Sequence, residues 1–383
     1  MLLKNATLFL QGRFQTGDLR VEDGRIIEIG QNLPGAGADL AGDYLLPGLV
    51  DLHTHGCGGF DFDHADEKQL RRMEQLYASR GTTAVLATLM TNPRPVMLAA
   101  AERLGFYSGS VIRGIYLEGP FFGAEMRGAH REEWLSPPDS VFFSALAQKS
   151  RGKLRIAAID PALPGAITWI ADHAAHFRLS LGHTACDAQT AQAAFSAGAG
   201  QVTHLFNAMR GLHHRAPGLL GEALAGNAFC ELICDGVHIH PTVLRLAFAA
   251  LGKRATVISD SMSACGLGDG CYTLGGQQVQ VKGSRATLAD GTLAGSVTFA
   301  YEGVLQLIRA GVAPEDAFFA ATATPAKAAG LDSVCGCIAP GRSADLIRAG
   351  RDWQRKQVWL AGRPQIREGI SDGNLSDVDG IAY

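Results

Sequence analysis

Two histidines separated by one residue follow the first strongly apolar run of this chain. His53 and His55 come directly after residues 49–52, Leu-Val-Asp-Leu. In an extended segment, side chains two positions apart point to the same face, so both imidazoles can reach one cation. Imidazole is a good ligand for zinc, iron or nickel. A lone histidine after a strand is usually an ordinary hydrogen-bonding group, whereas a pair with this spacing indicates chelation.

Other polar residues stand directly after later apolar runs in the same way. They are Glu118, His183, His204, His238 and Asp260. Taken alone, Glu118 could be a salt-bridging carboxylate, and Asp260 could cap the helix that follows it. The repeated position, more than any single member, indicates that these side chains share one site.

The residue types in this set suit hydrolysis by activated water. A metal ion lowers the pKa of bound water towards neutrality. A nearby carboxylate can hold the proton of that water and later deliver it to a leaving amine. Asp260 is the candidate for this role, because its strand contributes a single acidic group with no basic neighbour. The sequence therefore predicts a metal-dependent hydrolase, in which one metal position stays open for water or substrate.

These residues need a scaffold that brings the ends of many strands together. Short apolar runs, each followed by a helical pattern, occur at 49–52, 84–87, 113–117, 154–158, 178–181, 201–203, 231–234 and 255–258. Such alternation predicts parallel strands with crossover helices, and about eight units predict a closed (β/α)8 TIM-like barrel. Barrel active sites lie at the carboxyl ends of the strands, where the polar residues fall. Clear helices are expected at 66–80 and from about Ser296 onward.

The two chain ends have a different pattern from the middle. Residues 1–46 alternate short strand-like runs with Gly and Asp turns, and so does much of 335–383. We expect both ends to form one small β-sandwich domain, with the barrel spanning 47–334. Residues 271–294 are expected to form an inserted Gly-rich hairpin of unknown role.

Composition limits the other classes of protein. The 383 residues carry a formal net charge of −3, with no basic cluster, no signal-like start and no apolar stretch of membrane-span length. Nucleic-acid and membrane partners are not expected. The eight cysteines form no paired CxxC motifs, which favours reduced thiols in a cytoplasmic enzyme. Neither a GxSxG elbow nor a Walker loop is present.

With these residues assembled, the chain resembles the amidohydrolase superfamily and, within it, the N-acetylglucosamine-6-phosphate deacetylase family. The resemblance covers nearly the whole chain. It rests on the motifs PGLVDLHTHG at 47–56, LEGPF at 117–121, GHT at 182–184, VTHLFNAM at 202–209 and APGRSADL at 339–346. The first and last motifs are common to the superfamily, whereas HLFNAM and LEGP are specific to the deacetylase branch.

The resemblance implies a set of roles. Glu118, His183 and His204 would bind one divalent metal, zinc or iron, and the retained His53 and His55 imply a second metal bridged through Glu118. Asp260 matches the general acid/base, and His130 matches a residue that contacts the N-acetylated sugar and helps to stabilise the oxyanion. The positions that match the sugar-phosphate site are Asn207, the Ala208 backbone, Arg215 and His238. Some phosphate contacts in the family cross a dimer interface, which implies a homodimer.

Several alternatives stay open at this point. The same chemistry could act on N-acetylgalactosamine 6-phosphate, because the epimers differ at one hydroxyl. Many cyclic-amide and N-acyl-amino-acid hydrolases bridge two metals with a carboxylated lysine, and Glu118 at the bridging position argues against that branch. A catalytically dead scaffold should have lost ligands, but none is missing. One departure from the family is Ser259-Asp260-Ser261-Met262 where many members have Thr-Asp-Ala-Met.

Overall fold

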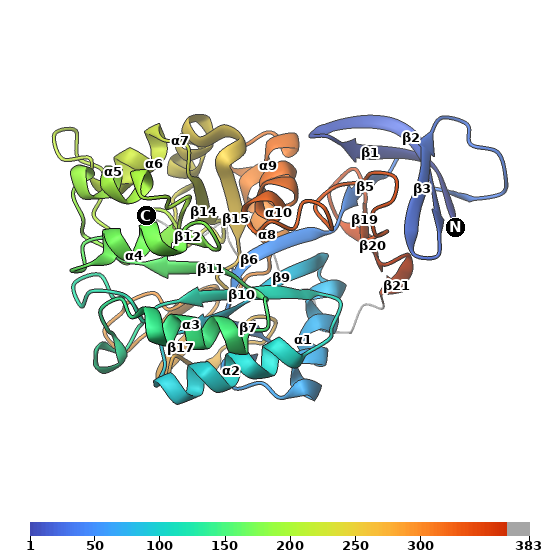
Figure 1. The fold of residues 1–383 in the computed structure, drawn as a ribbon. Helices are drawn as coiled ribbons and strands as arrows, with labels where there is room; N and C mark the ends of the chain where they lie inside the picture. The colour runs from blue at the N-terminus through green and yellow to red at the C-terminus, as the bar shows by residue number, and fades with distance from the viewer. Residues whose placement is uncertain (366–383) are drawn as a thin grey trace.

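The computed structural model describes residues 1–365, which form a parallel barrel and a separate small sheet (Figure 1). The barrel strands are β6 (Leu49–Thr54), β9 (Thr82–Met90), β10 (Ile112–Glu118), β11 (Leu154–Ile159), β12 (Arg178–Leu181), β13 (Gln201–Val202), β14 (Phe229–Ile233) and β15 (Ala255–Ile258). They pair in parallel in the order β15-β14-β13-β12-β11-β10-β9-β6. The Asp260 backbone N–H donates to the His53 carbonyl across 2.9 Å, which links the two ends of this order. All eight predicted strands are confirmed.

The barrel strands are buried on both faces, which explains their nearly continuous apolar sequences. In β9 every one of the nine residues is buried. Alternate side chains such as Val50, Leu86, Tyr116 and Ile156 form a cluster inside the barrel. The intervening side chains pack outward against the helices.

The helices lie around the outside of the barrel. They are α1 (Glu67–Ser79), α2 (Arg94–Phe106), α3 (Ser140–Lys149), α4 (Ala166–His173), α5 (Ala188–Ser196), α6 (Gly218–Ala225), α7 (Pro241–Leu251), α8 (Ala300–Arg309), α9 (Pro314–Ala320) and α10 (Ala323–Ala328), with 3₁₀ turns at Glu132–Trp134 and Gly252–Arg254. Helix α1 begins with a capping box between Asp66 and Gln69, as expected for the predicted helix at 66–80. Helix α8 begins at Ala300, later than predicted, because Ser296 is occupied in hydrogen bonds to Ser259 and Met262.

Both chain ends contribute to one β domain. Its strands are β1 (Leu2–Leu10), β2 (Arg13–Glu22), β3 (Arg25–Gly30), β4 (Ala38–Asp39), β5 (Tyr44–Pro47), β19 (Leu346–Ala349), β20 (Arg355–Leu360) and β21 (Arg363–Gln365). Strand β5 joins the ends, since it pairs with β1 on one side and β19 on the other. All eight strands belong to one hydrogen-bonded sheet, whose core includes Leu8, Leu45, Leu346 and Trp359. The predicted barrel with a separate β domain built from both chain ends is confirmed.

The exact domain limits stay predictions. Strand β5 crosses the expected limit between residues 46 and 47. Within the expected C-terminal part, 335–383, the first strand begins only at Leu346. The part of the expected domain beyond residue 365 lies outside the described residues. Within residues 1–365, no helix combines the length and apolar character that a membrane span needs. The cytoplasmic location stays a prediction.

The segment after β15 carries an inserted sheet. Strands β16 (Gly270–Leu274), β17 (Gln277–Lys282) and β18 (Arg285–Thr287) pair antiparallel, so the predicted hairpin has a third strand. Buried side chains of the insert pack with Met90 and Met262, which lie at or just beyond the carboxyl ends of β9 and β15. A two-stranded ribbon, β7 (Gly56–Cys57) and β8 (Phe60–Asp61), follows β6. The insert therefore covers part of the barrel face on which the predicted site lies.

Candidate active site

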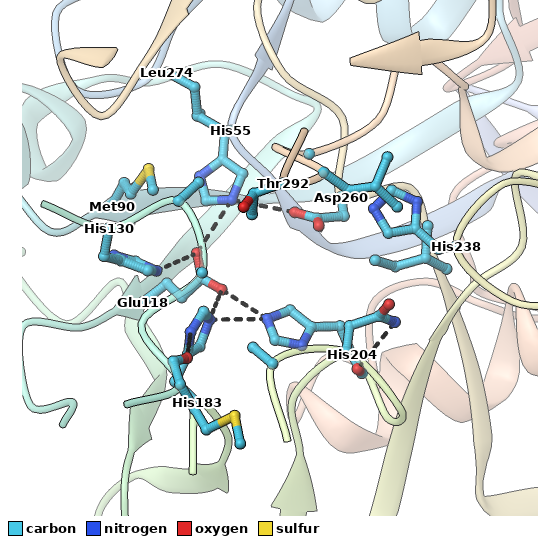
Figure 2. Close-up of a pocket in the computed structure, with 18 of the residues that line it drawn as sticks. His55, Met90, Glu118, His130, His183, His204, His238, Asp260, Leu274 and Thr292 are labelled. Atoms are coloured by element: carbon cyan, nitrogen blue, oxygen red, sulfur yellow. Dashed lines mark hydrogen bonds and ion pairs between the residues drawn. The ribbon is translucent and has the colours of Figure 1, made fainter. Parts of the chain in front are cut away.

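A cavity of about 360 Å³ lies at the carboxyl ends of the barrel strands (Figure 2). Its lining includes predicted site residues that come from six different strand ends and loops. They are His55, Glu118, His130, His183, His204, Asn207, Ala208, His238 and Asp260. His53 lies directly beneath, fully buried. The convergence expected from the barrel is therefore present.

Glu118, the last residue of β10, lies between two groups of histidines. Its Oε1 atom is 3.2 Å from His183 Nε2 and 3.1 Å from His204 Nε2. Those two ring nitrogens are themselves 3.0 Å apart. Three donor atoms thus converge on one point at the floor of the cavity.

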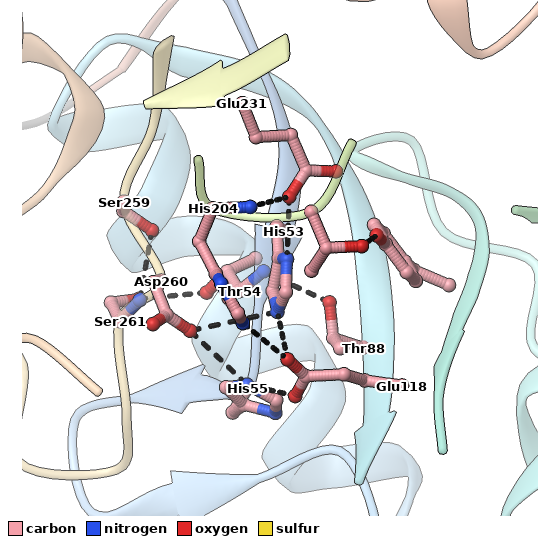
Figure 3. Close-up of polar contacts among 12 residues, drawn as sticks. His53, Thr54, His55, Thr88, Glu118, His204, Glu231, Ser259, Asp260 and Ser261 are labelled. Carbon is pink, nitrogen blue, oxygen red and sulfur yellow. Dashed lines mark hydrogen bonds and ion pairs between the residues drawn. The ribbon is translucent and has the colours of Figure 1, made fainter. Parts of the chain in front are cut away.

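The second group contains His53, His55 and Asp260, again with Glu118 (Figure 3). His55 Nε2 is 3.2 Å from both Glu118 Oε2 and Asp260 Oδ1. His53 Nε2 is 3.3 Å from Glu118 Oε1 and 3.6 Å from Asp260 Oδ1. One carboxylate, Glu118, is therefore shared by both groups, as expected for a bridging ligand.

The buried carboxylates favour positive charge on His53 and His55, whereas burial lowers the pKa of His183 to about 4. Burial lowers the pKa of His53 and His55, but the carboxylates of Glu118, Glu231 and Asp260 outweigh it. The pKa of His55 rises to about 9, and that of His53 rises well above its ordinary value. Burial would raise the pKa of Glu118, yet His53 and the other imidazoles hold it well below its usual range. In the chain alone, protons supply the charge that the buried carboxylates require.

The same atoms fit a divalent cation. His53 Nδ1 is held at 2.9 Å by Glu231 Oε2, so Nε2 is the atom that can exchange its proton for a metal. That Nε2 is buried and makes no hydrogen bond among the described residues. His183 Nδ1 donates to the Met126 carbonyl at 3.0 Å, which leaves its Nε2 lone pair facing Glu118. Imidazole nitrogens and carboxylate oxygens are the ligands that zinc and iron accept.

Unusual backbone conformations turn three of these side chains into the cavity. His183, His204 and Asp260 have φ values of +50°, +26° and +49°. Residues other than glycine seldom adopt such values, which cluster at functional sites where the surroundings enforce them. Each of the three lies just beyond a strand end, and the loop residue Ala208 at +49° shares the feature. These conformations direct the side chains of His183, His204 and Asp260 into the cavity.

Asp260 has the environment of a proton acceptor. Burial alone would raise the pKa of its carboxyl, but the hydrogen bond from His55 and the charge on His53 lower it. Asp260 is consequently ionised at neutral pH. It lines the cavity, so its carboxylate can take a proton from a molecule held there.

His130 lies on the opposite wall from Asp260 (Figure 2). Its Nδ1 is 2.8 Å from Thr91 Oγ1, and its Nε2 is 3.6 Å from Glu118 Oε2. Burial lowers the pKa of His130 despite its contact with Glu118. The ring is thus neutral and can orient a polar substrate group through hydrogen bonding.

The structure places three of the four residues predicted to bind phosphate at the cavity and the fourth outside it. Asn207, Ala208 and His238 line the cavity. His238 Nδ1 is 2.7 Å from Asp235 Oδ2, and although burial lowers its pKa, this contact raises it above the usual value. Arg215 does not line the cavity of the single described chain. It is exposed, with its guanidinium 2.8 Å from His214 Nε2.

Two buried carboxylates that contact the site were missed by sequence reasoning. Glu231, fully buried in β14, accepts hydrogen bonds from His53 Nδ1 and from the His204 backbone N–H at 3.1 Å. Asp51 in β6 accepts from the Ser259 backbone N–H at 3.1 Å, and burial raises its pKa to about 6. Both stand inside otherwise apolar strands. A charged residue in a fully buried strand was the signal that could have identified them.

Comparison with known proteins gives a consistent result. Residues 44–374 match the model of the Amidohydrolase family. An N-acetylglucosamine-6-phosphate deacetylase from Vibrio furnissii is 36% identical over 327 residues, which cover 83% of this chain and 82% of that protein. An N-acetylgalactosamine-6-phosphate deacetylase from Escherichia coli O157:H7 is 33% identical over 361 residues, covering 92% of this chain and 96% of the relative.

A solved structure agrees over almost the whole length. It is a mutant N-acetyl-D-glucosamine-6-phosphate deacetylase from Mycobacterium smegmatis in complex with N-acetyl-D-glucosamine-6-phosphate. The TM-score is 0.90 at 31% sequence identity, and the match covers 96% of this chain and 99% of the other. The β domain and the barrel are therefore both shared with that structure.

Proposed function

This chain belongs to the amidohydrolase family, and we propose that it hydrolyses the acetamide of N-acetyl-D-glucosamine 6-phosphate to D-glucosamine 6-phosphate and acetate. The observation that carries the proposal is the shared carboxylate Glu118 between two groups of buried histidines, with Asp260 facing the same cavity. This arrangement suits amide hydrolysis, and the relatives named for this reaction match most of the chain.

The metal ligands follow from the two groups. One divalent cation, zinc or iron, would be held by Glu118, His183 and His204. A second would be held by His53 and His55 together with Glu118, giving one or two per subunit. When bound, such a cation polarises the acetyl carbonyl and lowers the pKa of water.

Asp260 transfers the proton, and His130 orients the substrate. Asp260 accepts a proton from the attacking water and later donates it to the amine nitrogen as the C–N bond breaks. His130 holds the acetamide so that its carbonyl carbon faces the water, and it contributes to stabilising the oxyanion. The oxygen of the water thereby ends in the acetate and one of its protons in the amine, and the Asp260 carboxylate returns to its ionised form.

The 6-phosphate would bind at the end of the cavity that contains Asn207, Ala208 and His238. The raised pKa of His238 favours its imidazolium form, which suits an anion. Arg215 lies outside this cavity in one chain, so we propose that it acts across the interface of a homodimer. An arginine fork is well matched to a phosphate dianion.

N-acetylgalactosamine 6-phosphate is the second candidate substrate. A relative named for that activity covers 92% of this chain at 33% identity. The two sugars differ only in the orientation of one hydroxyl group, and the metal and acid/base residues are equally suited to both.

The test is acetate release from both 6-phosphates and from N-acetylglucosamine without phosphate. Wild type should strongly prefer a phosphorylated sugar. His238→Ala and Arg215→Ala should each lower kcat/KM on it by roughly tenfold to a hundredfold, since a charge-assisted contact contributes about 1.5–3 kcal/mol. If wild type hydrolyses both forms of N-acetylglucosamine equally well, a broader N-acyl hydrolase replaces this proposal. Sedimentation of the wild-type protein tests the dimer separately.

A further inference from the structure

The two ends of the cavity differ in chemistry. The polar end contains Asn207 and His238, whereas apolar side chains line the other end. They include Met90, Ala129 and Leu274, which pack together in one cluster of buried side chains. In Figure 2, Met90 and Leu274 lie on the side of His55 and His130, away from His238. The proposed metal ligands lie between the two ends.

Buried side chains close the apolar end of the cavity. Met90, the last residue of β9, is only 2% exposed, and Leu274, the last residue of β16, is 5% exposed. The turn after β16 lies directly on Met90, because a Cβ atom on Gly275 would be 2.7 Å from Met90 Sδ. Barrel and insert therefore close this end together.

Hydrogen bonds fix the insert in that position. Gln277 Nε2 donates to the Ala129 carbonyl at 2.6 Å, next to His130. Ser263 Oγ donates to the Thr273 carbonyl at 3.1 Å, next to Leu274. The insert is thus tied both to the loop that carries His130 and to the segment that follows Asp260.

We propose that Met90 and the inserted residue Leu274 set the length of the acyl group that this site removes. The inference rests on the proposed function. Hydrolysis requires the carbonyl at the Glu118 cluster with its nitrogen towards Asp260, while the sugar phosphate extends to His238. The acyl substituent leaves the carbonyl carbon on the side opposite the nitrogen, so it enters the apolar end. A role thereby follows for the segment 271–294.

The closed wall predicts a steep dependence on acyl length. A misplaced methylene in a fitted apolar pocket changes the relative rate by roughly 10- to 200-fold. Wild type should therefore hydrolyse the acetyl substrate much faster than the propanoyl and butanoyl analogues. Met90→Ala removes the Cγ, Sδ and Cε atoms from the wall and should make room for the longer chains.

The experiment measures kcat/KM for N-acetyl-, N-propanoyl- and N-butanoylglucosamine 6-phosphate. Met90→Ala should raise the butanoyl-to-acetyl ratio at least tenfold over wild type, and Leu274→Ala should raise it in the same direction. Each variant is its own reference, so a general loss of activity does not alter the ratio. Met97→Ala is the matched control, because Met97 is equally buried but does not line the cavity. Its ratio should stay at the wild-type value.

The outcomes separate this inference from the function on which it rests. If wild type releases no acetate from the acetyl substrate, the proposed function fails. If acetate is released but wild type accepts all three acyl groups equally, the acyl-length inference is overturned. An unchanged ratio in both Met90→Ala and Leu274→Ala also overturns it. Should Met90→Ala not fold, Leu274→Ala and the milder Met90→Val decide the question.

Discussion

Buried carboxylates occur both in the β domain and at the barrel face, and their partners differ. In the β domain, the Asp18 oxygens accept from the backbone N–H groups of Asn5 and Leu33, both at 2.8 Å. Asp43 accepts from Arg348 Nε at 2.6 Å and from Lys356 Nζ at 2.8 Å. Every one of these donors keeps its proton at any physiological pH.

At the barrel face the carboxylates meet imidazoles instead. Among the described residues, the polar partners of the two Glu118 side-chain oxygens are all ring nitrogens, and several buried atoms there lack hydrogen-bond partners. Buried polar groups without partners cost free energy. The comparison teaches that the β domain uses buried charge for stability, whereas the barrel face gives up stability to keep exchangeable sites for metal and protons.

The largest expected effect comes from removing a ligand. His183→Ala and His204→Ala should each lose bound metal and nearly all activity, because three donor atoms converge at that point. Elemental analysis and acetate release measure the two losses. His53→Ala should lose only the second metal, with a smaller effect on rate. Far-UV circular dichroism should remain that of wild type, and full metal occupancy with normal turnover in His183→Ala would falsify the ligand assignment.

Asp260→Asn is expected to be nearly as damaging to catalysis. An amide cannot carry the proton from water to the amine, so kcat should fall by several orders of magnitude while substrate binding persists. Rapid-quench or steady-state rates and substrate titration separate the two properties. Wild-type turnover would place the base on another residue.

Glu231→Gln should have an intermediate effect. Glu231 fixes His53 through Nδ1 and His204 through its backbone N–H, and loss of such an outer carboxylate typically lowers metal affinity 10- to 100-fold. Competition with a chelator measures the affinity directly. Glu28→Gln is the control in the β domain, where the exposed Arg20–Glu28 pair should contribute almost nothing. Equal metal affinity in both variants would show that Glu231 is only structural.

The sequence predicted the barrel and most of the candidate site because both leave local patterns. Parallel strands buried on two faces are continuous apolar runs, and the polar residue after each run lies on one barrel face. Glu231 and Asp51 were included in the predicted strands, but nothing local in the sequence showed what their carboxylates contact. Only the fold shows that they face His53 and Ser259.

Other features depend on contacts distant in sequence. Strand β18 has only three residues, too short for a local pattern to identify. Helix α8 starts late because Ser296 bonds to Ser259, 37 positions earlier. The orientation of the loop carrying Arg215 could not be derived either, since no periodicity fixes where an exposed loop points.

The smallest expected effect comes from the β domain. Asp43→Asn removes the charge that Lys356 and Arg348 share. Because both cations are partly exposed, the loss should be about 1 kcal/mol, or roughly 1–2 °C in the thermal midpoint of a chain this long. Acetate release should be unchanged, which separates this carboxylate from those at the barrel face.

The pH dependence of this loss has a definite sign. Burial would raise the pKa of Asp43, but Lys356 and Arg348 lower it below its ordinary value of 3.8. A lowered folded pKa gives stability that is complete above 3.8 and is lost as pH falls through the folded value. The difference in thermal midpoint between wild type and Asp43→Asn should therefore be constant from about pH 5 to 8 and shrink in more acidic buffer. A difference that grows on acidification would mean that Asp43 is stabilised by something other than its two cations.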